Sequence, residues 1–99
     1  MFIYSFRISV VAADARSVQW SKQTAETVAR ITGVPTHVRI RVGGPLEVLF
    51  TAEHASMDSL LASQGKMAAD ADYQARIAKA VSDGLFVPGS TETAIWVEP

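Results

Sequence analysis

Two runs of alternating apolar and polar residues, 36–42 and 46–53, flank Gly43-Gly44-Pro45 and constrain this chain more than any other feature. Alternation with a period of two is typical of β-strands that bury one face. A single register gathers the apolar residues on one face, in the pairs Val38–Phe50, Ile40–Val48 and Val42–Leu46. The other face then holds the pairs Arg41–Glu47 and His37–Thr51. Since a slip of one residue would reverse both faces, the pattern predicts a hairpin with a three-residue loop and a glycine at positive φ.

The rest of the chain carries further strand and helix patterns. Residues 2–11 and 91–97 are rich in β-branched and aromatic side chains and indicate strands. Residues 14–32 predict a helix, with Asp14 as its N-cap and Gly33 just beyond its end. A second helix is expected to start at Ser56 and to break near Gly65 and across residues 68–72. A third should run to Ser82 and bury Tyr73, Ile77, Ala80 and Val81.

This order of elements predicts an α+β, ferredoxin-like βαββαβ fold in a single domain, residues 1–99. Its four-stranded antiparallel sheet should run in the order fourth, first, third, second strand, with the helices on one face. That face holds Phe2, Tyr4, Phe6, Ile8, Val38, Ile40, Val42, Leu46, Val48 and Phe50. The opposite face holds Ser5, Arg7, Ser9, His37, Arg39, Arg41, Glu47, Leu49 and Thr51. This polar face is either solvated or the lumen of a barrel made by two sheets.

Composition narrows the range of partners. The 99 residues carry nine Lys+Arg and ten Asp+Glu, and a net charge of -1 gives no general attraction to nucleic acid or anionic membranes. No stretch approaches the roughly 20 apolar residues of a membrane helix, and the N-terminus lacks the pattern of a signal peptide. The absence of cysteine removes disulfides and thiolate chemistry and suits a cytoplasmic protein.

Residues 56–90 add a more specific pattern. A helix is followed by the segment Asp-Ala-Asp-Tyr at residues 70–73, a second helix, and Phe-Val-Pro-Gly-Ser at residues 86–90. The pattern resembles the dimeric α/β-barrel superfamily, most of all its NIPSNAP-like branch, although it lacks the proline common there. The resemblance implies a homodimer with a pocket between sheet and helices. The superfamily includes cofactor-independent monooxygenases, cyclases, isomerases, haem-degrading proteins and members without assigned activity, so it implies no single reaction.

Tyr4 and His54 are the candidate catalytic residues. In the expected topology the first strand begins beside the end of the third, and both residues fall on helix-facing positions. A histidine beside a tyrosine in an apolar pocket can act as a general acid/base pair, because imidazole titrates near neutral pH. The alternative is that His54 is an exposed loop residue at the end of its strand.

Ser17, Trp20, Ser21 and Thr24 are candidate ligand-binding residues on the buried side of the first helix. Buried hydroxyls are unfavourable unless they are paired or face a polar pocket, and Trp20 could form a wall for a flat ligand. The alternative is close packing, with the hydroxyls bonded back to helix carbonyls.

Arg7, Arg39, Arg41 and Glu47 form a third set, on the polar face. In a barrel lumen they would bind an anion, or they would make ion pairs across strands and between subunits. His37, Glu47 and Glu53 match no metal-ligand spacing, and we expect neither a metal nor a bound cofactor.

Two functions fit these features. The first is a small-molecule-binding, cofactor-independent enzyme of monooxygenase, cyclase or isomerase type, acting by acid/base chemistry on a flat, partly apolar substrate. The second is a non-catalytic NIPSNAP-like dimer that binds a metabolite or a protein partner. A buried His54–Tyr4 pair beside a cavity favours the first, and a solid core with His54 in solvent favours the second.

Overall fold

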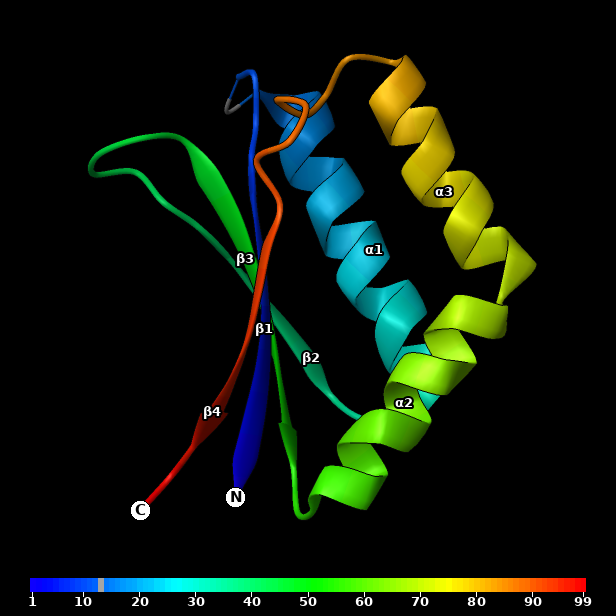
Figure 1. The fold of residues 1–99 in the computed structure, drawn as a ribbon. Helices are drawn as coiled ribbons and strands as arrows, with labels where there is room; N and C mark the ends of the chain where they lie inside the picture. The colour runs from blue at the N-terminus through cyan, green and yellow to red at the C-terminus, as the bar shows by residue number, and fades with distance from the viewer. Residues whose placement is uncertain (13) are drawn as a thin grey trace.

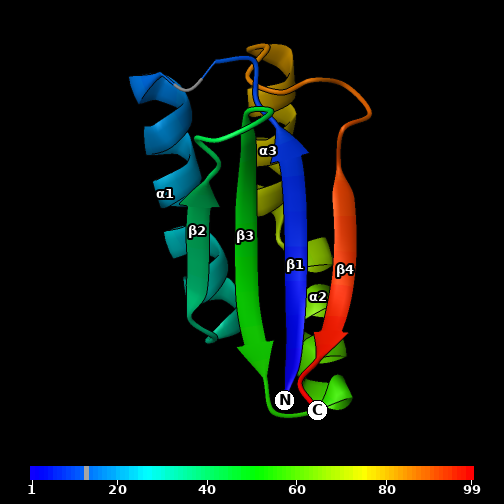
Figure 2. The same cartoon turned by 90° about the vertical axis from the view of Figure 1, so that its left-hand side faces the viewer.

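A computed structural model of the chain describes residues 1–12 and 14–99. In chain order its elements are β1 (Phe2–Ser9), α1 (Ala15–Thr32), β2 (Thr36–Ile40), β3 (Glu47–His54), α2 (Met57–Ala69), α3 (Ala71–Ser82) and β4 (Glu92–Val97). The strands form one antiparallel sheet in the order β2-β3-β1-β4. The helices lie on one face of this sheet, and the other face is open (Figures 1 and 2). The α+β, ferredoxin-like fold and its strand order are therefore confirmed.

The predicted hairpin register is confirmed. β2 and β3 pair with Val38 opposite Phe50 and Ile40 opposite Val48. Just beyond the last pair, the Arg41 backbone N–H donates to the Glu47 carbonyl at 2.9 Å. Gly44 has a φ of 96°, the left-handed conformation expected of a glycine in this loop.

The hairpin loop is longer than predicted. β2 ends at Ile40 and β3 begins at Glu47, so the strands part before Val42 and Leu46 can face each other. Val42 is 91% exposed rather than covered by helices, because the tip of the hairpin projects away from the helix layer (Figure 1). The Arg41 side chain holds the loop instead, since its Nε donates to the Gly43 carbonyl at 2.8 Å.

β1 ends two residues earlier than predicted. Beyond Ser9, the Val10 backbone N–H donates to the Leu46 carbonyl at 3.2 Å, and that of Val11 donates to the Leu85 carbonyl at 3.1 Å. Val10 therefore still bonds the residue that precedes β3, while the chain also pairs with the segment that follows α3. Val11, at the end of this path, is exposed.

The helix boundaries follow from side-chain caps. The Asp14 carboxylate accepts from the Ser17 N–H at 2.9 Å, and Gly33 ends α1 with a φ of 74°. The Ser56 hydroxyl accepts from the Ser59 N–H at 3.1 Å at the start of α2. These predicted caps are confirmed.

Asp70 alone separates α2 from α3. The break predicted at Gly65 is wrong, because α2 continues to Ala69; a glycine in an exposed helix interior costs only about 1 kcal/mol. The Asp70 carboxylate accepts from the Tyr73 N–H at 2.8 Å, which caps α3. Its own N–H donates to the Met67 carbonyl at 3.3 Å, which closes α2.

The tightest part of the core lies toward the end of β1. Its buried members are Ile8, Val10, Ala25, Val48, Phe50, Ala80, Leu85 and Phe86. The Trp20 ring packs edge-on against Phe50 and Phe86, with centroid distances of 6.3 and 4.7 Å. The last turn of α3 is less buried than predicted, since Val81 is 60% exposed.

The double role of Asp70 generates a stability prediction. Asp70→Ala removes the acceptor for the Tyr73 N–H and should lower the free energy of unfolding by about 1 kcal/mol. Asp70→Ser keeps a capping oxygen and should retain most of the stability. Urea unfolding followed by circular dichroism measures both. Equal losses in the two variants would show that the cap contributes nothing.

Candidate functional site

A cavity of about 50 Å³ lies between the sheet and the helices, toward the start of β1. Its walls come from β1, α1, β2, β3, α2 and α3, and they combine aromatic and aliphatic side chains with a few neutral polar groups. The lining residues include Tyr4, Phe6, Trp20, Thr24, Phe50, His54, Gln64, Met67, Tyr73 and Ile77. Among the described lining residues there is no Lys, Arg, Asp or Glu. The site therefore suits an uncharged, partly apolar ligand.

His54 lies in this cavity and is 5% exposed, so the alternative of an exposed loop residue is wrong. It is the last residue of β3, and alternation along that strand turns it beneath the helices. Burial lowers the pKa of His54 below its ordinary value. Its Nδ1 lies 3.5 Å from the Ser59 hydroxyl in the first turn of α2. At neutral pH the imidazole is therefore uncharged and can accept a proton.

Tyr4 lines the same cavity as His54. In the sheet, His54 faces Phe2 and Tyr4 faces Ala52, so the two residues are diagonal neighbours on adjacent strands. No hydrogen bond joins their side chains within the part of the chain that the structure describes. Burial raises the pKa of Tyr4, which keeps its phenol protonated and able to donate.

Tyr73 is a site residue that the sequence analysis placed in the core but not in the site. It lines the cavity from the first turn of α3, just after the Asp70 cap. Its pKa is raised by burial and, secondarily, by the neighbouring charge of Tyr4 when that phenol ionises. Both phenols line the same cavity. The signal for Tyr73 was its place directly after the helix break.

The four residues predicted on α1 divide into two pairs. Trp20 and Thr24 line the cavity. Ser17 and Ser21 are buried outside its lining, and the Ser21 hydroxyl donates to the Ser17 carbonyl at 2.8 Å. For Ser21, the back-bonded alternative describes the structure.

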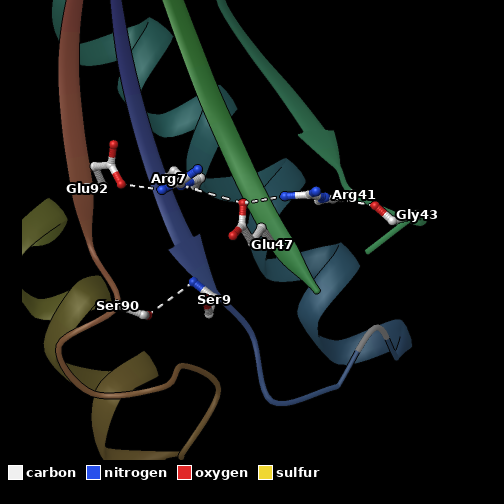
Figure 3. A network of polar contacts seen from close by, with 7 residues as sticks. All are labelled: Arg7, Ser9, Arg41, Gly43, Glu47, Ser90 and Glu92. Atoms are coloured by element: carbon white, nitrogen blue, oxygen red, sulfur yellow. Dashed lines mark hydrogen bonds and ion pairs between the residues drawn. The ribbon is translucent and has the colours of Figure 1, made fainter. Parts of the chain in front are cut away.

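The polar face carries a chain of ion pairs that crosses the sheet (Figure 3). Glu47 Oε2 forms ion pairs with Arg7 Nε at 3.5 Å and with Arg41 Nη1 at 3.6 Å. Arg7 also pairs with Glu92, a residue of β4 that the sequence analysis did not include. From Glu92 through Arg7 and Glu47 to Arg41, the ion pairs thus run across the sheet from β4 over β1 and β3 to the end of β2. Cross-strand ion pairing, one of the two roles predicted for this set, is present within the chain.

Two further features complete the polar face. Arg39 stands apart from the ion pairs, and its Nη1 donates to the Thr51 hydroxyl at 3.4 Å. A shallow hollow of about 620 Å³ lies over this face, with Ile3, Leu49 and Trp96 among its walls. Across residues 1–12 and 14–99, no group of three His, Asp or Glu side chains is placed to hold a metal ion.

Comparisons with known proteins give the fold a family context. A NIPSNAP family protein from Agrobacterium tumefaciens is similar over 99% of this chain and 92% of its own, with a TM-score of 0.75 and 20% identity. A NIPSNAP domain protein from Burkholderia xenovorans covers 100% of this chain and 95% of its own, with a TM-score of 0.77 and 15% identity. The chain shares its fold with these two proteins.

A functionally described structure shares this fold. SnoaB, a cofactor-independent oxygenase from Streptomyces nogalater, matches 99% of this chain and 92% of its own, with a TM-score of 0.68 and 16% identity. No protein-family model and no curated protein sequence matches the chain. At these identities the NIPSNAP-like resemblance is confirmed for the fold, and the reaction is a separate question.

The buried histidine generates a pH prediction. Because the folded pKa of His54 lies below its unfolded value of roughly 6.5, the unfolded chain takes up a proton first as the pH falls. Stability should be complete above about pH 6.5 and should decline as the pH drops toward the folded pKa. In His54→Leu this part of the decline disappears, whereas His37→Leu, at an exposed position, retains it.

Urea unfolding of the three proteins at pH 7.5 and pH 5.0 measures this difference. The same loss of stability on acidification in His54→Leu as in the parent protein would contradict the assignment of a buried, neutral imidazole.

Proposed function

We propose that this chain binds a small, uncharged, flat and partly apolar molecule in the cavity, and that it transforms that molecule by acid/base chemistry without a bound cofactor. The observation that carries the proposal is His54, a buried imidazole in an uncharged aromatic cavity. Its lowered pKa leaves it unprotonated at neutral pH, which is the state a general base needs.

The phenols supply the complementary role. The raised pKa values of Tyr4 and Tyr73 keep both hydroxyl groups as donors. A substrate that loses a proton to His54 develops negative charge on a nearby oxygen, and a Tyr4 hydrogen bond stabilises that charge. The likeness of the fold to SnoaB, a cofactor-independent oxygenase, supports this class of chemistry.

A second function is favoured by the size of the cavity. Its volume of about 50 Å³ is well below the roughly 150 Å³ of a cavity that admits benzene. The alternative is a non-catalytic NIPSNAP-like dimer that binds a metabolite or a protein partner, and a protein partner on the surface needs no larger space. Proton exchange between His54 and a bound molecule distinguishes the two functions.

The polar face supports the homodimer in this proposal. Trp96 stands on it 60% exposed, beside Ile3 and Leu49, and its Nε1 donates to the Ser5 hydroxyl at 3.0 Å. The chain exposes 5997 Å², against about 5,500 Å² for a typical monomer of this size. The sheet of a second copy, packed on this face, would bury the additional exposed surface and enclose the ion pairs in a barrel. A cytoplasmic location, suited by the lack of cysteine, stays part of the proposal.

None of the helices within the described ranges combines the length and the hydropathy of a membrane span.

Proton exchange tests the catalytic proposal with 2-tetralone, a neutral bicyclic ketone whose α-carbon protons exchange slowly with solvent. In D₂O the protein should accelerate α-deuteration, with His54 removing the proton and returning a deuteron. His54→Gln should lose most of the acceleration, because general base catalysis contributes on the order of a hundredfold or more. Proton NMR follows the loss of the α-proton signal.

His37→Gln is the matched control, because His37 is exposed and outside the cavity lining. It should exchange at the parent rate. Binding of 2-tetralone without any acceleration would favour the non-catalytic function, and equal loss in both variants would remove His54 as the base.

Trp96→Arg tests the dimer, since it places a further cation on the polar face without filling a buried space. Sedimentation equilibrium at tens of micromolar should show a dimer for the parent protein and a monomer for this variant. Val81→Arg makes the same kind of change at an equally exposed position among the helices, and it should remain dimeric. A parent protein that sediments only as a monomer contradicts the barrel.

A further inference from the structure

Two polar groups of α1 are buried without a partner. The indole Nε1 of Trp20 and the hydroxyl of Thr24 are closed to solvent and make no hydrogen bond with the described residues. Both side chains line the cavity, and Thr24 is only 3% exposed. Buried polar groups are nearly always paired in folded proteins, so an orphaned pair at a cavity wall indicates a missing partner.

Thr24 differs from three other buried hydroxyls of its helix. Those of Ser21, Thr27 and Thr32 each donate to the carbonyl four residues earlier at 2.8 Å. The same helical geometry offers Thr24 the Trp20 carbonyl, yet the structure shows no such bond. The Thr24 hydroxyl is therefore free to bond a group inside the cavity.

Trp20 and Thr24 lie on one face of α1. Residues four apart on a helix are neighbours, with Cβ atoms about 5–6 Å apart, and both side chains line the same cavity. Two donors bond one oxygen when each lies about 2.9 Å from it. A single acceptor oxygen between the two side chains is the simplest partner for the Trp20 N–H and the Thr24 O–H.

The chemistry of the walls selects the kind of oxygen. An ionised carboxylate is disfavoured, because the described lining contains no cation to balance it. A water molecule has two hydrogens of its own to place; the rings of Phe50 and Phe86 beside Trp20 accept neither, which leaves the hydroxyl, amide and imidazole groups elsewhere in the lining. A ketone oxygen brings two lone pairs and no hydrogen, which matches two donors.

From this match we infer that Trp20 and Thr24 form a recognition site for the carbonyl oxygen of a neutral ring ketone. The inference rests on the proposed function, because it concerns a ligand in the same cavity. Trp20 packs against Phe50, and the cavity that it lines with Thr24 also includes His54 on β3.

The experiment compares 1-tetralone with tetralin, which has the same ring system without the oxygen. Isothermal titration should show the parent protein preferring 1-tetralone. In NMR spectra, 1-tetralone but not tetralin should move the Trp20 indole N–H signal downfield. Thr24→Val and Trp20→Phe should each reduce the preference on the order of fivefold, the effect of one neutral hydrogen bond.

Thr27→Val is the control, since it removes a buried hydroxyl of the same helix that already bonds the Gln23 carbonyl. Its preference for 1-tetralone should equal that of the parent protein. Equal binding of both compounds to the parent protein, with the indole signal unmoved, would overturn the inference and leave the proposed function standing. Failure of both compounds to perturb cavity resonances would overturn the two together.

Discussion

The antiparallel pairing of β1 with β3 is the constraint on which the rest of the structure depends. It sets Tyr4 opposite Ala52 and Arg7 opposite Leu49, and so decides which side chains face the helices and which face outward. Because side chains alternate with a period of two, a slip of one residue would exchange the cavity wall for the ion-pair network. The ion pairs from Glu92 through Arg7 and Glu47 to Arg41 cross the sheet on the face that this register turns outward (Figure 3).

Much of the fold could be predicted because parity and capping are local properties of the sequence. Alternation fixed the pairing of Val38 with Phe50, and single side chains such as Asp14 and Ser56 marked helix starts. Predictions of burial were wrong where they depended on how far the helix layer and the sheet extend over each other. Val42 and Val81 belong to apolar patterns, but the helix layer does not extend over the first and the sheet does not reach the second.

The candidate site was predictable as far as strand alternation decides which side chains face the helices. Parity placed Tyr4 and His54 beneath the helices, and the burial of His54 follows because α2 folds back directly after β3. Sequence could not choose among hydroxyls on one helix face. Ser21 and Thr24 share that face, and only side-chain rotation decides that the first bonds a helix carbonyl while the second stays unpaired at the cavity.

The cavity is smaller than the proposed ring ligand, so side chains of a wall have to move for the ligand to fit. The sheet wall is fixed by ladder hydrogen bonds and by the ion pairs on its far side. On the helix wall, Gln64, Met67, Tyr73 and Ile77 are only half-buried, and Asp70 alone joins the two helices that carry them. Methionine and glutamine change rotamer at little cost. We therefore expect space for a ring to come from the half-buried side chains of α2 and α3 rather than from the buried Thr24 and His54.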